Sequence, residues 1–345
     1  MKLFYFSGTG NARHVAYWMN NFAKTKNFET EIIDISKLKS RKEIKIEKNC
    51  LIGFCSPTHG FNFPPIMFHF ILRFPRPKAN KVFIINTRAG MKMGKYFLPG
   101  LSGITQYFSA FILWLKGYKV IGMHPIDLPS NWISFHPGIK PKVVESIYGK
   151  RKRETERFAQ KILSGKTDRK ALRDLFQDIA ITPITALYYI IGRFILAKSF
   201  YASKDCTNCM LCVNKCPVQA IKLVDKRPFW THKCESCMQC MNICPERAIE
   251  TAHGFVIGIF YFISSVLLVL IYKWLGINSI INQFIPEWLS GIVQFFIDAV
   301  LIIFLFFSFY RLFHYLLRFK PFERLIYYTS LTRFKFWRRY KAPDM

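Results

Sequence analysis

Acidic residues are scarce in this chain of 345 residues. It contains 21 Asp and Glu against 50 Lys and Arg, a formal net charge of +29 at pH 7. Such a balance is typical of nucleic-acid-binding proteins and of proteins that lie beside an anionic membrane. The sequence has no nucleic-acid-binding module, so we expect no nucleic acid as a partner. A hydrophobic content of 51%, with 35 Phe, favours membrane segments flanked by basic surfaces.

A secretory signal is also missing. The apolar run at residues 2–6 is too short for a signal peptide, and glycines follow it closely. Disulfides are therefore not expected among the ten cysteines. Cys50 and Cys55 lie in the apolar run CLIGFC and are predicted to be small hydrophobic residues of a buried strand.

The other eight cysteines form an internal repeat. CTNCMLCVNKCP begins at Cys206, and CESCMQCMNICP begins 28 residues later, at Cys234. An Ala-Ile pair follows each copy at the same offset. Structural zinc also uses Cys-x-x-Cys pairs, but two zinc sites would need neither the cysteine triplets nor the Cys-Pro endings. Because four thiolates complete the open corners of a cubane, the repeat predicts two [4Fe-4S] clusters.

The repeat resembles that of two-cluster bacterial ferredoxins, in which the fourth cysteine of each run binds the other cluster. The resemblance implies two crossed ligand sets. One cluster is assigned to Cys206, Cys209, Cys212 and Cys244, and the second to Cys234, Cys237, Cys240 and Cys216.

A second pattern lies at the N-terminus. A predicted strand at residues 2–6 is followed by a loop of small residues and a predicted helix at residues 12–24. Such an arrangement gathers backbone N–H groups around a phosphate. The loop lacks the Lys-Ser/Thr of a nucleoside-triphosphate loop and the third glycine of a dinucleotide loop, and it suits a terminal phosphate monoester. The loop residues are Ser7, Gly8, Thr9, Gly10 and Asn11.

This loop resembles the phosphate loop of flavodoxins, Ser/Thr-x-Thr-Gly after the first strand, and the resemblance implies FMN. One departure is Ala12, where flavodoxins usually carry a hydroxyl residue. Alternating strands and helices follow, which predicts an α/β flavodoxin-like, doubly wound parallel sheet. The strands are predicted at 29–35, 51–56, 81–87 and 119–124, and the helices at 64–73, 98–115 and 140–163.

In such a sheet the ligand lies beyond the carboxyl ends of the strands. Two loops there match the isoalloxazine-holding loops of flavodoxins. Either His59 or Phe61 is expected to stack on the flavin or to face solvent, and Arg88 either stabilises the reduced flavin or is solvated. Residues 128–132 are expected to close over the site. The two loops are Pro57, Thr58, His59, Gly60 and Phe61, and Asn86, Thr87, Arg88, Ala89 and Gly90.

An apolar stretch at residues 179–197, interrupted by Pro183 and Arg193, allows two interpretations. It is either a transmembrane helix or a helix on the bilayer surface or packed on the protein. The second is favoured, because a span would place the flavin and the clusters on opposite sides of the membrane.

Two runs near the C-terminus predict a membrane hairpin. Residues 254–272 carry no charge, and residues 290–310 carry only Asp298. Because Lys and Arg are missing from 274 to 310 and return at Arg311, the segment after 311 is predicted to be cytoplasmic, with Lys273 in conflict. Trp274 and Trp288 suit interface anchors on the far side. Asp298 is either a functional acid within a span or an interface residue, if the span covers 299–317.

The predicted organisation has five parts. They are an FMN-binding domain at 1–165, a linker at 166–203, a small α+β two-cluster ferredoxin domain at 204–253, two transmembrane helices at 254–317 and a basic aromatic tail at 318–345. The tail is expected to lie on an anionic membrane surface or to dock a partner. Residues 1 to about 250 resemble the flavodoxin–ferredoxin fusion proteins of anaerobes, a resemblance that does not extend to the hairpin.

We therefore expect a multi-pass cell-membrane protein with both domains on the cytoplasmic side. It would transfer electrons between a soluble carrier (a ferredoxin or flavoprotein), FMN, two [4Fe-4S] clusters and a membrane-associated acceptor such as a quinone or a membrane redox complex. A reductase with its own two-electron substrate or quinone is the alternative, and a redox sensor or assembly factor is a third. No His/Asp/Tyr constellation marks an acid–base site, so no catalytic residue is predicted.

Overall fold

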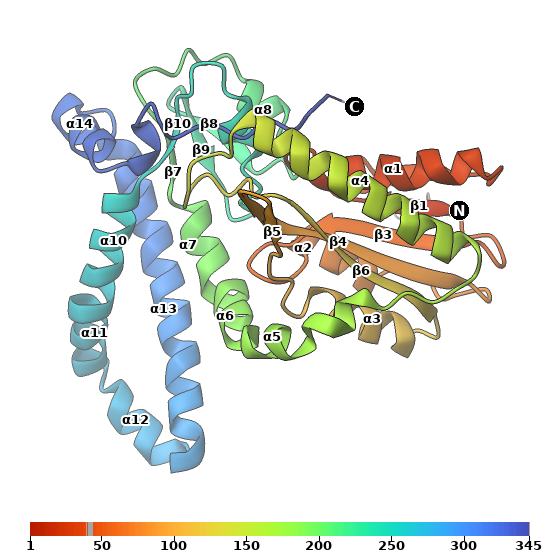
Figure 1. Ribbon diagram of the computed structural model, residues 1–345. Helices are drawn as coiled ribbons and strands as arrows, with labels where there is room; N and C mark the ends of the chain where they lie inside the picture. The colour runs from red at the N-terminus through yellow and green to blue at the C-terminus, as the bar shows by residue number, and fades with distance from the viewer. Residues whose placement is uncertain (39, 41–43, 345) are drawn as a thin grey trace. The chain divides into compact units, whose positions relative to one another are not determined.

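The computed structural model describes residues 1–38, 40 and 44–344 (Figure 1). The chain forms two compact units. The first contains Met1–Ala186, Cys237–Asn242 and Arg338–Met345, and the second contains Leu187–Ser236 and Ile243–Trp337. Part of the second cysteine run and the end of the chain therefore belong with the N-terminal region.

The first unit is built on a parallel sheet. Its parallel strands lie in the order β2-β1-β3-β4-β6, and β5 pairs antiparallel with the end of β4. Numbered consecutively, the parallel strands have the order 2-1-3-4-5, which is that of flavodoxin. The strands are β1 (Lys2–Tyr5), β2 (Glu31–Asp34), β3 (Ile52–Pro57), β4 (Lys81–Met93), β5 (Tyr96–Leu98) and β6 (Lys119–Pro129).

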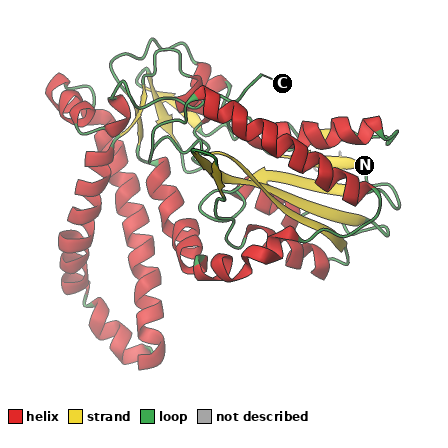
Figure 2. Ribbon diagram, in the orientation of Figure 1, coloured by secondary structure: helices red, strands yellow, loops and turns green. Residues whose placement is uncertain are grey.

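Helices cover both faces of this sheet. One pair, α1 and α4, packs together on one face, and α2 and α3 pack together on the other (Figure 1 and Figure 2). Because both faces are covered, the central strands are apolar on both sides, with Phe4, Phe54 and Phe83 fully buried. The predicted doubly wound α/β architecture is confirmed. These helices are α1 (Asn11–Thr25), α2 (Pro65–Leu72), α3 (Thr105–Leu115) and α4 (Pro141–Leu163).

The strands β4 and β6 differ most from the prediction. The sequence indicated strands at 81–87 and 119–124 with loops after them, but the pairing continues from Asn86 opposite Pro125 to Gly90 opposite Pro129. Residues 86–90 are therefore strand rather than loop. The helix predicted at 98–115 likewise begins only at Thr105: Leu98 ends β5, and residues 99–104 belong to neither a helix nor a strand.

Small elements surround the cysteine repeat. In the second unit, β7 pairs antiparallel with β10, and β8 forms a hairpin with β9. The two copies share one backbone pattern: Asn208 and Met210 have left-handed φ, as do their counterparts Ser236 and Met238. The elements are β7 (Phe200–Ala202), α8 (Leu211–Asn214), β8 (Ile221–Val224), β9 (Arg227–Trp230), α9 (Gln239–Ile243) and β10 (Ile249–Thr251).

Two helices of the second unit are long and apolar enough to cross a membrane. The first, His253–Leu275, has 23 residues and combines α10, η4 and α11, and the second, α13 (Glu287–Leu316), has 30. The parts of the first helix and the connecting helix are α10 (His253–Phe262), η4 (Ile263–Leu267), α11 (Leu268–Leu275) and α12 (Ile277–Phe284).

Within this hairpin the acid in the apolar part of α13 has a partner. The hydroxyl of Tyr272 donates a hydrogen bond to Oδ1 of Asp298 over 2.7 Å. Pairing of this kind lowers the cost of holding a carboxyl group in apolar surroundings. Trp274 and Trp288, the predicted interface anchors, are both largely exposed.

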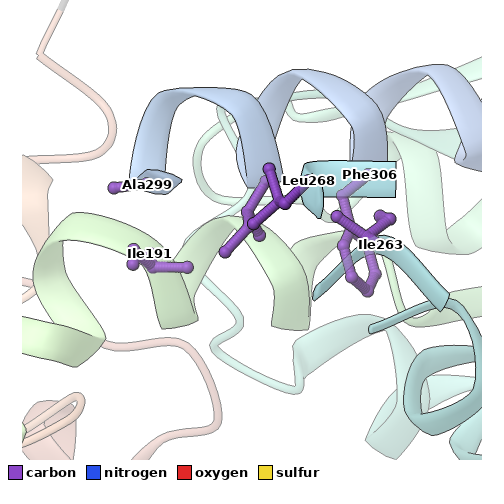
Figure 3. Packing of buried hydrophobic residues seen from close by; sticks show 6 residues of the cluster. Ile191, Ile263, Leu268, Ala299 and Phe306 are labelled. Carbon is purple, nitrogen blue, oxygen red and sulfur yellow. The ribbon is translucent and has the colours of Figure 1, made fainter. Parts of the chain in front are cut away.

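A third apolar segment packs against the hairpin. Ile191 in η3 belongs to a buried cluster with Ile263, Leu268, Ala299 and Phe306 (Figure 3). This contact supports the interpretation of a helix packed on the protein. The helices before and within this segment form a pair bent by 76°, which would give a third crossing only if the pair were one span. The elements are η2 (Lys170–Asp174), α5 (Leu175–Ala180), α6 (Thr182–Leu187), η3 (Tyr188–Gly192) and α7 (Arg193–Ala197).

The tail after the hairpin packs partly on protein. It contains α14 (Lys320–Tyr328) and η5 (Leu331–Arg333). The side chain of Arg247 donates to the carbonyl of Trp337 over 2.6 Å, and Trp337 is buried. The end of this segment is therefore held by the protein, and its contact with a membrane surface or a partner stays a prediction.

Candidate cofactor sites

The loop at residues 7–11 turns sharply between β1 and α1. Gly10 has φ +102°, a conformation that favours glycine, and its N–H donates to Oγ of Ser7 over 3.1 Å. The loop therefore leads directly into the N-terminus of a 15-residue helix, where backbone N–H groups favour an anion. This geometry fits the phosphate group of FMN.

The segment after β6 approaches the same loop. The side chain of Asn131 donates to Oγ1 of Thr9, and the ring of Trp132 lies 6.4 Å from that of His59, with 37° between the planes. The loop, the segment after β3 and the segment after β6 therefore meet at one edge of the sheet. The sequence predicted that residues 128–132 close over this edge, but it did not single out Asn131 or Trp132.

The segment after β3 is a tight turn. His59 and Asn62 exchange backbone hydrogen bonds of 2.8 and 3.2 Å, and the two residues between them, Gly60 and Phe61, have left-handed φ. His59 is buried, whereas Phe61 is partly exposed. At the start of the turn, the N–H of Thr58 donates to the carbonyl of Thr87 over 2.8 Å. This turn is therefore anchored to β4.

Arg88 lies inside the sheet and is buried. Its Nε donates to Asp127 and its Nη1 to Asp174, each over 2.6 Å. Burial alone would lower the pKa of Arg88, but the two carboxylates outweigh this effect and raise it. Asp127 and Asp174 thus balance the positive charge of Arg88, which the sequence analysis had considered as a partner for a reduced flavin. Contact between Arg88 and a flavin stays a prediction. The neighbouring Asn86 donates to Oγ1 of Thr58 over 2.7 Å.

Four cysteines from both copies of the repeat surround one pocket of the second unit. They come from the first three positions of the first copy and the last position of the second, as crossed ligation requires. Burial, followed by the charges of Cys206 and Cys244, raises the pKa of the Cys212 thiol to about 11. The four cysteines that line the pocket are Cys206, Cys209, Cys212 and Cys244.

Backbone N–H groups point at the sulfur atoms of the crossing cysteines. Ala220 donates to Sγ of Cys216 and Ala248 to Sγ of Cys244, each over 3.3 Å. Burial raises the pKa of Cys234 to about 12, and the nearby Cys216 contributes to this rise. Cys216 and Cys234, assigned to one cluster, are therefore neighbours in the second unit. Among the residues that the structure describes, no three of His, Cys, Asp or Glu are grouped to hold a single metal ion.

The remaining two cysteines belong to the first unit, in the stretch Cys237–Asn242, and both are buried. In this unit Cys237 lies against the phosphate loop. A Cβ atom added to Gly8 would lie 2.6 Å from Cβ of Cys237 and 3.1 Å from its Sγ. Gly8 thus lets a predicted cluster ligand approach the predicted phosphate loop.

Residues 205–249 match the 4Fe-4S dicluster domain family. The match includes all eight cysteines of the repeat, so this part of the chain is a 4Fe-4S ferredoxin-type domain. The chain combines it with a sheet of flavodoxin strand order.

Solved structures similar to the chain include flavodoxins. A short-chain flavodoxin associated with a bacterial microcompartment is 14% identical, covers 48% of this chain and 97% of its own, and has a TM-score of 0.31. A flavodoxin from the Archaea is 18% identical over 47% and 99% of the two chains, with a TM-score of 0.29. The two-electron reduced flavodoxin of Megasphaera elsdenii is 16% identical over 44% and 99%, with a TM-score of 0.29. No curated protein matches the sequence.

A buried lysine near the repeat was not found from the sequence. Lys198 donates to the carbonyl of Trp230, and its Nζ lies within 5 Å of the ring centres of Phe229, Phe307 and Tyr310. In the sequence, Lys198 is a cation directly after an apolar run. That pattern is also typical of a helix end at a membrane surface, so it did not indicate a buried lysine.

Proposed function

We propose that the protein is a membrane-anchored iron–sulfur flavoprotein. It transfers electrons between a soluble low-potential carrier, FMN, two [4Fe-4S] clusters and a membrane-associated acceptor such as a quinone or a membrane redox complex. The clusters exchange single electrons and FMN one or two, so the pair couples one- and two-electron chemistry.

One observation carries this proposal. Gly8, in the loop predicted to hold the flavin phosphate, approaches Cys237, a predicted cluster ligand, so closely that a Cβ would overlap it. In the same unit, the hydroxyl of Ser134 donates to Sδ of Met238 over 3.3 Å, which ties the cysteine stretch to the segment after β6. Both contacts support a short path between a bound flavin and a cluster.

The charge of the first unit supports a negatively charged carrier. Opposite charge speeds the encounter of redox partners and fixes their orientation. Seven basic side chains line one pocket beside α4, together with two carboxylates and a histidine. The basic residues are Lys150, Arg153, Arg157, Lys161, Arg169, Lys170 and Arg173.

The decisive experiment is anaerobic purification in detergent followed by iron, sulfide and flavin analysis. We expect about eight irons, about eight sulfides and one FMN per chain, since each cubane contains four irons. Four or fewer irons after reconstitution would exclude the second cluster. Iron without bindable FMN would exclude the flavin-to-cluster path.

The path itself is tested with Gly8→Ala. The added Cβ pushes the loop away from Cys237, so we expect slower electron transfer between flavin and clusters in stopped-flow absorbance. Gly149→Ala on α4 is the matched control, because a Cβ there meets nothing within 4 Å. Unchanged kinetics in a Gly8→Ala protein that retains both cofactors would contradict the proposed path.

A further inference from the structure

The end of the chain lies against the phosphate loop within the first unit. The N–H of Gly138 donates to the carbonyl of Arg338 over 2.7 Å, and the guanidinium of Arg338 donates back to the carbonyl of Gly138 over 2.9 Å. A Cβ at position 138 would lie 2.7 Å from the carbonyl oxygen of Arg338. Because Gly138 has no Cβ, the backbone of the tail can pack closely against it.

Tyr340 is the anchor of this tail. Its side chain is buried, and its N–H donates to Oδ1 of Asn242 over 2.5 Å. Its hydroxyl lies 2.9 Å from that of Tyr148 and donates to Oδ1 of Asn11. A residue almost at the C-terminus is thus hydrogen bonded to the last residue of the phosphate loop.

These bonds fix the side chain of Asn11. Its Oδ1 accepts from both Tyr148, over 2.7 Å, and Tyr340, and its Nδ2 donates to the carbonyl of Pro129 over 2.9 Å. The amide is held from three directions while largely buried. Removing one partner from such a buried polar group leaves it with an unmade hydrogen bond, which is costly.

The tail continues past Tyr340 along the start of α1. A Cβ at Gly10 would lie 2.9 Å from Cβ of Ala342, and Nε2 of His14 lies 2.9 Å from the carbonyl of Pro343. The tail therefore contacts Gly10, Asn11 and His14, which span the end of the loop and the first turn of the helix.

We propose that the segment from Arg338 to Asp344 is a structural part of the FMN phosphate site, with Tyr340 as the positioning residue that locks Asn11 and the loop. This inference rests on the proposed binding of FMN. It makes flavin affinity in the N-terminal domain depend on residues that the chain supplies only after the membrane hairpin.

The test is the dissociation constant of FMN, measured by quenching of flavin fluorescence on the full-length protein in detergent. Loss of one buried hydroxyl in Tyr340→Phe should weaken binding about three- to tenfold. A chain that ends at Trp337 should bind at least as weakly as this variant. Tyr96→Phe, which removes the hydroxyl of an exposed tyrosine, should bind like the wild type.

A second variant leaves loop and tail chemically intact. Gly138→Ala places a Cβ against the carbonyl of Arg338, and we expect weaker FMN binding here too. The inference would be overturned if Tyr340→Phe, Gly138→Ala and the shortened chain all bound FMN with the affinity of the wild type. Tighter binding in the shortened chain would also overturn it, because the tail would then block the site.

The two possible failures are distinguishable. If the wild type binds no FMN, the proposed function fails, and the inference fails with it. If the wild type binds FMN and the tail variants bind equally well, only the inference fails. Thermal denaturation of the FMN-free proteins gives an independent readout, since loss of the tail contacts should lower the melting temperature of the first unit.

Discussion

At the scale of single residues, the fourth cysteine of each copy has the clearest assignment. Cys216 and Cys244 each accept a backbone hydrogen bond from the alanine four residues later. Each also lies near cysteines of the other copy: Cys244 in the pocket with Cys212, and Cys216 beside Cys234. These positions are compatible with the crossed ligand sets that the resemblance to ferredoxins implied, and the ligand assignment stays a prediction.

Replacing Cys216 with Ser should damage the cluster assigned to Cys234, Cys237 and Cys240 and leave the other in place. We expect about half of the iron to be lost, because each cubane contains four irons. The electron paramagnetic resonance spectrum of the reduced variant should match that of Cys237→Ser. A match with Cys209→Ser would instead show that the ligand sets are not crossed. Cys50→Ser should retain all the iron.

Residue spacing could predict these thiols because each set of three lies within one short segment. It could not predict Asn131 or Tyr340, which reach the phosphate loop from 122 and 329 residues along the chain. Nor could it predict that Arg88 would be held by two carboxylates, since Asp127 and Asp174 belong to other elements. Contacts of this kind depend on the folded arrangement and leave no local pattern.

At the scale of elements, a charged cluster joins α4 to β6 and η2. Glu154 in α4 accepts hydrogen bonds from Arg151, over 2.5 Å, from Lys170 in η2, and from His124 in β6, over 3.3 Å. Burial alone would raise the pKa of Glu154, but the hydrogen bonds from His124 and Lys170 outweigh it and hold the pKa well below its ordinary value of 4.5. The ionised carboxylate therefore stabilises the folded first unit.

Glu154→Gln should lower the stability of the first unit by about 1.5–3 kcal/mol at neutral pH, the range for hydrogen bonds to charged groups. Because the folded pKa lies below the unfolded one, this stabilisation is complete above pH 4.5 and is lost as the pH falls toward the folded value. Thermal denaturation from neutral to acidic pH should show the wild type and the variant converging. A difference that is constant with pH would contradict the ionic origin, and Glu156→Gln on the same helix is the control.

Element positions were largely predictable, whereas some element lengths were not. The apolar runs placed the five parallel strands, because a strand covered on both faces is apolar throughout. The extension of β4 to Met93 was missed because polar residues such as Asn86 and Arg88 suggested a loop. Both side chains form hydrogen bonds with partners on β6, α3 and the turn after β3. Local hydropathy does not reveal these partners.

At the scale of the whole molecule, the first unit limits how often the chain can cross a membrane. Met1–Ala186 and the tail from Arg338 belong to one compact unit, so if the apolar helices cross a membrane, these two parts lie on the same side of it. Between Ala186 and Arg338 the number of crossings must therefore be even. The two long helices of the hairpin meet this condition, whereas a third crossing by the bent pair at Lys170–Ala180 and Thr182–Ala197 would not.

We therefore predict that the N-terminus and the C-terminus are both cytoplasmic and that α12 lies on the far side. This direction is predicted from the absence of Lys and Arg from 274 to 310 and their return at Arg311. An epitope tag inserted after Asn278 in α12 should bind antibody in intact bacterial spheroplasts. Tags at either terminus should bind antibody only after permeabilisation. Termini found on opposite sides would show that residues 179–197 cross the membrane, and the contacts of Tyr340 with Asn11 could not then form in one chain.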